Sequence, residues 1–151
     1  MTLTQKETAL LNDLRSGEQL CIEKYTKYGA MANDPALKGI FSNLSRDEQA
    51  HLKTINEILA GNEVSSSSES PSATAAKISP APSACSPDEK SDDAYLCRDA
   101  LSMEKHVSSV YDTSVFEFSS PVLRDTLAHI QKEEQNHGEI LYNYLDANGM
   151  Y

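Results

Sequence analysis

Two copies of one spaced pattern, 86 positions apart, constrain this chain more than any other feature of its sequence. In each copy a lone Glu is followed 30 residues later by a Glu-x-x-His unit. The six residues are Glu18, Glu48, His51, Glu104, Glu134 and His137. A Glu and a His three positions apart share one face of a helix, so both side chains are able to bind one ion. Four carboxylates and two imidazoles in this arrangement form the ligand set of a two-metal site inside a four-helix bundle.

Apolar residues at 3-4 spacing predict the helices that would carry this site. We expect helices at 4–32, 35–60, 91–118 and 121–147. Pro35 and Pro121 suit the first helical position, and Gly61 and Gly149 stand where C-terminal caps belong. Each apolar stripe is interrupted only in mid-helix, where it carries Glu or Glu-x-x-His. The predicted fold is all-α: an antiparallel four-helix bundle built from two helical hairpins joined by a long crossover.

The predicted organisation is a single domain, residues 1–151, with a linker between the hairpins. The hairpins are expected at 4–61 and 91–148, and the linker at 62–90. This segment is rich in Ser, Ala and Pro and has almost no large apolar residues, so it cannot bury enough surface to fold alone. If extended, it would reach up to ~95 Å, more than the ~40 Å length of a bundle.

Composition excludes several classes of function. The formal net charge of −10 argues against a nucleic-acid partner or an anionic membrane, because both select for basic patches. No apolar run approaches the roughly 20 residues of a spanning helix, and the N-terminal residues lack a secretory pattern, so we expect a cytoplasmic location. Cys21, Cys85 and Cys97 form no Cys-x-x-Cys pair, which excludes a rubredoxin-type iron site or zinc knuckle on spacing.

The charge balance of the six residues favours two cations. Buried carboxylates cost several kcal/mol each if left unpaired, and two divalent ions would neutralise four of them. Oxygen and imidazole ligands suit iron or manganese, and zinc less specifically. The predicted bridging ligands are Glu48 and Glu134, the terminal carboxylates are Glu18 and Glu104, and the nitrogen ligands are His51 and His137. Tyr25 and Tyr111, each seven residues after the lone Glu, are candidates for hydrogen bonds to the ligands and for electron donation.

With these residues in view, the chain resembles the ferritin-like di-metal carboxylate proteins. GEQLCIEKY (17–25) and DEQAHL (47–52) are similar to the metal-binding helices of rubrerythrins. The paired halves and LLNDL (10–14) resemble the spore coat protein F family. Val107 stands where rubrerythrins have a further Glu. Gln49 stands where haem-binding relatives have Met, so no haem is expected.

The resemblance implies a di-metal, first of all di-iron, oxidoreductase that acts on peroxide or oxygen with an unidentified electron donor. Two alternatives remain: a structural spore-coat-type protein with a structural or vestigial metal site, and a di-manganese catalase-like protein. The first alternative implies a location in the spore coat. Whether the chain is an enzyme therefore stays open at this point.

A homo-oligomer, most simply a dimer, is also expected, because the helices carry more apolar residues than one buried stripe per helix accounts for. The residues outside the seam are Leu10, Leu20, Ile22, Ile40, Leu101, Val115 and Phe116.

Overall fold

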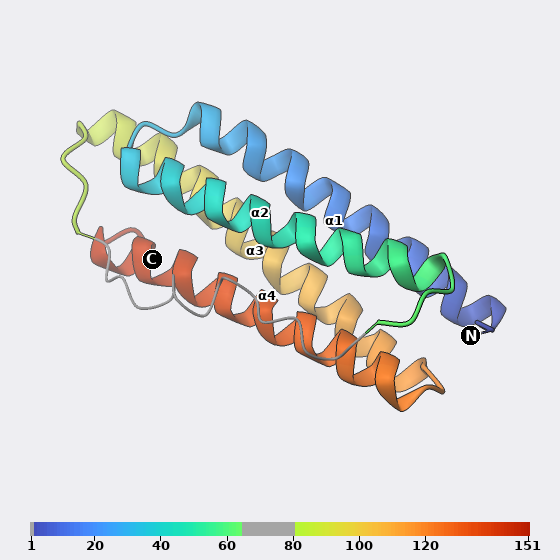
Figure 1. Cartoon of the computed structure of the whole chain (residues 1–151). Coiled ribbons are helices and arrows are strands. Elements are labelled where there is room, and N and C mark those ends of the chain that lie inside the picture. The colour runs from blue at the N-terminus through green and yellow to red at the C-terminus, as the bar shows by residue number, and fades with distance from the viewer. Residues whose placement is uncertain (1, 65–80) are drawn as a thin grey trace.

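The computed structural model describes residues 2–64 and 81–151, and all of their regular structure is helical (Figure 1). The helices are α1 (Gln5–Met31), α2 (Pro35–Leu59), α3 (Pro87–Glu117) and α4 (Pro121–Ala147). The predicted all-α fold is confirmed. The predicted linker at 62–90 falls largely on residues 65–80, which lie outside the described part of the chain.

The start of α3 was predicted too late, at residue 91. The helix begins at Pro87, because Ser86 caps it: the Ser86 side chain accepts a hydrogen bond from Glu89 N, and the Glu89 carboxylate accepts one from Ser86 N. This reciprocal pair is a capping box with a proline at the first helical position. Residues 87–90 are therefore helix and not linker, although they follow the linker directly and contain no large apolar residue.

The two hairpins lie side by side in opposite directions (Figure 1). Within each hairpin the helices are antiparallel and closely packed, α1 on α2 and α3 on α4. Between hairpins, α1 contacts α3, and α2 contacts α4. α2 ends at one end of the bundle, and α3 starts at the other. As a result, α1 runs antiparallel to α3, and α2 runs antiparallel to α4. This arrangement relates the two halves by an approximate two-fold axis, as the 86-residue repeat leads one to expect.

A buried acid in each half binds the turn of the other half. The Glu7 carboxylate in α1 accepts hydrogen bonds from Ser119 N (2.9 Å) and Oγ (3.0 Å), in the turn between α3 and α4. The Asp93 carboxylate in α3 accepts from Asn33 N (2.7 Å) and Asp34 N (2.9 Å), in the turn between α1 and α2. Glu7 and Asp93 are 86 residues apart, so the repeat extends beyond the six predicted ligands.

The core follows the predicted stripes closely. Of the residues at the predicted 3-4 spacing, only Tyr28 in α1 is half-buried. The other residues at this spacing are buried along all four helices. Of the residues behind the dimer prediction, Leu101 is buried, whereas Leu20 and Phe116 are exposed. The dimer itself stays a prediction. In the described part of the chain no helix is long and apolar enough to cross a membrane.

Replacing Glu7 with glutamine should lower the free energy of unfolding at pH 7 by about 1–3 kcal/mol, because charge-assisted hydrogen bonds are lost. Its backbone hydrogen bonds with Ser119 and Thr4 hold the pKa of Glu7 at about 2, below the ordinary 4.5. A lowered folded-state pKa means that this stability is present above pH ~4.5 and is lost as the pH falls toward 2. Urea denaturation should therefore show a smaller difference between wild type and variant at pH 3 than at pH 7.

The matched control is Glu23→Gln, an exposed residue of the same helix, which should change stability by less than about 0.5 kcal/mol. An equal deficit of Glu7→Gln at both pH values would contradict the role given to this carboxylate.

Candidate metal centre

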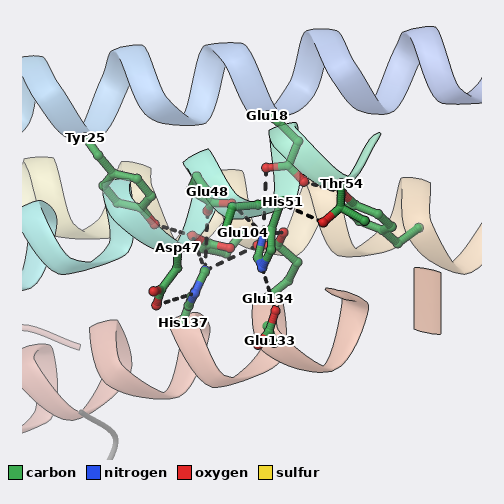
Figure 2. Close-up of polar contacts among 12 residues, drawn as sticks. Glu18, Tyr25, Asp47, Glu48, His51, Thr54, Glu104, Glu133, Glu134 and His137 are labelled. Atoms are coloured by element: carbon green, nitrogen blue, oxygen red, sulfur yellow. Dashed lines mark hydrogen bonds and ion pairs between the residues drawn. The ribbon is translucent and has the colours of Figure 1, made fainter. Parts of the chain in front are cut away.

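The structure brings the six predicted ligands together at the middle of the bundle (Figure 2). α1 and α3 each contribute the lone glutamate, and α2 and α4 each contribute the Glu-x-x-His pair. No more than 3% of any of these residues is exposed to solvent. The helices place them there because each stands on the buried stripe of its own helix, between apolar residues one turn away on either side.

The ligand atoms form two overlapping groups, in each of which the atoms lie within 4.8 Å of one another. The first group is Glu18, Glu48, His51 and Glu134, and the second is Glu48, Glu104, Glu134 and His137. Glu48 and Glu134 belong to both groups, which is the position expected of bridging carboxylates. Glu18 and Glu104 belong to one each, as expected of terminal ligands. The binding of metal stays a prediction.

Both histidines turn Nδ1 toward the cluster. His51 Nδ1 lies 3.0 Å from Glu48 Oε2 and 3.0 Å from Glu134 Oε1. His137 Nδ1 lies 3.3–3.4 Å from oxygens of Glu48, Glu104 and Glu134. In this orientation Nδ1 is the atom of each ring that is placed to bind a cation, and Nε2 points away from the cluster.

Two carboxylates that the sequence analysis missed contact the outer nitrogens. Glu133 Oε2 lies 2.8 Å from His51 Nε2, and Asp47 Oδ2 lies 3.3 Å from His137 Nε2 (Figure 2). Each acid thus contacts the histidine of the opposite hairpin. A carboxylate in this position fixes the tautomer that leaves Nδ1 free for a metal. The sequence does contain a signal for these two acids. Asp47 and Glu133 directly precede the predicted bridging ligands and are 86 residues apart.

The two predicted tyrosines also contact the opposite hairpin. Tyr25 in α1 donates a hydrogen bond to Glu104 in α3, and Tyr111 in α3 donates one to Glu18 in α1. Each tyrosine follows the glutamate of its own helix by two turns, so it cannot reach that residue. Because α1 and α3 are antiparallel, it lies level with the glutamate of the other helix. The phenols therefore hold one oxygen of each terminal carboxylate.

Several buried atoms of the cluster have no hydrogen-bond partner among the described residues. All four glutamates are affected, at Glu18 Oε2, Glu48 Oε1, Glu104 Oε2 and both oxygens of Glu134. Both ring nitrogens of His137 belong to the same set, and the nearest group to Nε2 is the Asp47 carboxylate at 3.3 Å. Buried polar groups are rarely left in this way, because each loses its hydration without compensation. Oxygen and imidazole donors that face a common centre are the set that fits iron or manganese ions.

Burial and mutual repulsion favour protonated carboxyls in the absence of a cation. Burial, reinforced by the charges of Glu104 and Glu18, raises the pKa of Glu134 to about 8. Burial and the charge of Glu48 also raise the pKa of Glu18. Glu104 differs: its burial acts in the same direction, but the charge and hydrogen bond of His137 outweigh it and hold the pKa at about 2.

The histidines are shifted toward the charged form. Burial alone would lower the pKa of His51, but the charge of Glu134 and the hydrogen bond with Glu133 raise it well above its ordinary value. For His137 the hydrogen bond with Asp47 acts in the same way against burial. Protons on the imidazoles thus balance part of the negative charge that cations would otherwise balance.

Cys21 lies beside the cluster but is not a reactive thiol. It is fully buried, and burial together with the charges of Glu48 and Glu104 raises the pKa of its thiol far above the ordinary value. A thiol in this environment stays protonated, so it neither attacks a substrate nor binds metal readily.

In protein stripped of metal by a chelator, Glu134→Gln should raise the free energy of unfolding by about 1–3 kcal/mol, because a poorly compensated buried acid is replaced by a neutral group of the same shape. The control Glu139→Gln, exposed on the same helix, should change stability by less than about 0.5 kcal/mol. Urea denaturation measures both. A marked loss of stability in Glu134→Gln would show that the metal-free cluster is not strained.

Comparison with known protein families finds one match, in the C-terminal part of the chain. Residues 92–151 match the family described as the Coat F domain. The matched segment includes Glu104, Glu134 and His137, whereas α1 and α2 lie outside it. No curated protein and no solved structure matches the chain. The four-helix bundle is compatible with a ferritin-like fold, and the resemblance to the spore coat protein F family is confirmed over residues 92–151.

Proposed function

We propose that this chain is a spore-coat-type four-helix bundle whose centre binds two metal ions, and that the ions stabilise the bundle. The observation that carries the proposal is the pair of overlapping ligand groups that share Glu48 and Glu134 and contain unpartnered buried oxygens. The Coat F match supports the location in a spore coat. The donor set supports iron or manganese as the bound ion.

A site of this kind would join all four helices. Glu18 and Glu104 bring in α1 and α3, and the Glu-x-x-His pairs bring in α2 and α4. A shared ion converts repulsion among these residues into attraction, so the bound form resists separation of the hairpins. Stabilisation by a ligand that binds only the folded state grows with its concentration relative to the dissociation constant.

The surrounding residues prepare the ligands for this role. Glu133 and Asp47 hold the outer nitrogens of His51 and His137, which leaves each Nδ1 directed at the cluster. Tyr25 and Tyr111 bind the terminal carboxylates and limit their rotation. Preorganised ligands lose less conformational entropy when an ion binds.

Manganous ion at about 100 times its dissociation constant should add about 2.7 kcal/mol of stability for each ion bound, or about 5.4 kcal/mol for two, which for a chain of this size raises the melting temperature by roughly 10–20 °C. Glu48→Ala should abolish the increase, because it removes a ligand of both ions. Asp92→Ala, an exposed acid of α3, should retain it. Thermal unfolding followed by circular dichroism decides the matter; an identical melting temperature of wild type with and without metal would refute a stabilising site.

Removing either outer carboxylate should weaken metal binding by about 10–100-fold without changing the ligands themselves. We expect this of both Glu133→Ala and Asp47→Ala, since the two occupy equivalent places in the two halves. The exposed Asp112→Ala serves as the control. Isothermal titration with manganous ion gives the three affinities. Unchanged affinity in both variants would show that these acids do not orient the histidines for metal.

A redox enzyme acting on peroxide or oxygen is the second candidate. It is supported by the donor set, which favours redox-active metals, and by the two phenols that contact terminal ligands. A bound iron or manganese pair would supply the redox chemistry. The chain would supply the ligands, the phenols and an environment from which water is largely excluded.

The two candidates differ in turnover. If the enzyme candidate is correct, iron-loaded protein should consume hydrogen peroxide with ascorbate as the electron donor, and Glu134→Ala should not. If wild type and variant are equally inert while the wild type is stabilised by metal, the site is structural and the enzyme candidate is wrong.

A further inference from the structure

A cavity between α3 and α4 reaches the predicted ligands from one side of the bundle. Its volume is about 530 Å³. The innermost lining residues are Glu104 and Glu134, each about 1% exposed. Tyr142 and Tyr151 also line it, with their rings in edge-to-face contact at a centroid distance of 4.9 Å. The cavity therefore extends from exposed residues at the surface to two of the predicted metal ligands.

The corresponding face of the other hairpin carries a cavity with a different lining. Its volume is about 400 Å³, it lies on α2, and it includes Gln49 and Asn56, the residues 86 positions before Gln135 and Tyr142. None of the predicted ligands lines it. The cavity between α3 and α4 therefore differs from this one in that it is lined by two predicted ligands.

The two cavities have different residues at one equivalent position. Gly138 lines the cavity on α4, and the residue 86 positions earlier is Leu52. A side chain at position 138 would project toward Leu101, because a Cβ placed there would lie 3.6 Å from Leu101 Cδ1. That distance is an ordinary contact, so packing does not require glycine here. Glycine inside a helix costs about 1 kcal/mol relative to alanine, and here it leaves the space open.

We propose that this cavity is the route by which divalent cations enter the metal centre. The inference rests on the proposed function, because it assumes that the centre binds metal. Both oxygens of Glu134 and Oε2 of Glu104 are buried and form no hydrogen bond with the described residues. The oxygens of Glu134 contact ring nitrogens that are themselves predicted ligands, His51 Nδ1 at 3.0 Å and His137 Nδ1 at 3.4 Å, so an arriving cation could bind these groups together. Glu139 adds a carboxylate among the exposed lining residues. The outer lining carries one acid, Glu139, and one base, Lys105, whereas the inner end carries Glu104 and Glu134. A cation that enters here therefore reaches its negative charge at the inner end, and Glu134 is a member of both predicted ligand groups.

Cobaltous ion is a suitable probe, because its visible absorbance reports binding without any need for turnover. Gly138→Leu places in the second half the residue found in the first and should fill the opening. We expect uptake to slow by about tenfold or more while two cobalt ions per chain still bind at equilibrium. Gly138→Ala should slow uptake less. The control is Gly39→Leu, which substitutes an exposed glycine of α2 with no neighbouring atoms within 4 Å of the added Cβ.

The outcomes separate this inference from the proposed function. If wild type binds no cobalt, the metal centre and its entry route both fail. If wild type binds two ions and Gly138→Leu takes them up at the same rate, only the route is wrong. If the folded Gly138→Leu variant binds fewer than two ions at equilibrium, Gly138 supports the centre itself and the route is again overturned. Slower uptake to the same endpoint, with Gly39→Leu unchanged, is the supporting result.

Discussion

Four carboxylates buried together at the centre of the bundle are the constraint on which the rest of the structure depends. Their mutual repulsion and lost hydration oppose folding, so the apolar layers above and below must outweigh them. Long stripes of buried residues on all four helices provide these layers. At the ends, Glu7 and Asp93 join each hairpin to the turn of the other. The polar centre is thus enclosed along its length and fixed at both ends.

The approximate two-fold symmetry means that each predicted ligand, and each residue that contacts a ligand, has an equivalent in the other half of the chain. The contacts of the tyrosines and of the outer carboxylates cross between hairpins in the described part of the chain: Tyr25 binds Glu104, and Glu133 contacts His51, each with an equivalent 86 residues away. No hairpin alone would complete a ligand group, so assembly of the centre requires both halves. The symmetry is not complete: Gly138 in α4 corresponds to Leu52 in α2, and the cavity lined by Gly138 is also lined by Glu104 and Glu134.

Periodicity sufficed to predict the helices and the six clustered residues, because the buried stripe of a helix repeats regularly along the sequence. It did not suffice for α3, whose first turn is set by the local capping box at Ser86 and is hidden by linker-like composition. The hydrogen-bond partners of Tyr25 and Tyr111 depend on which residues of α1 and α3 lie level with each other. The spacing of residues within one helix does not give this information. The roles of Asp47 and Glu133 could have been predicted, because both residues obey the 86-residue repeat. The spacing of the metal ligands alone does not indicate them. The cavity depends on a missing side chain at Gly138 and on the packing around it.

The Coat F match and the buried cluster lead to one account: a coat-type bundle with a di-metal centre. The most direct test is elemental analysis of the intact protein purified from cells grown with added iron and, separately, with added manganese. The account predicts two metal ions per chain under at least one of these conditions, and fewer than one in a chain with both Glu48→Ala and Glu134→Ala. A metal-free wild type under both conditions would contradict it and would leave the cluster as a vestige of an ancestral site.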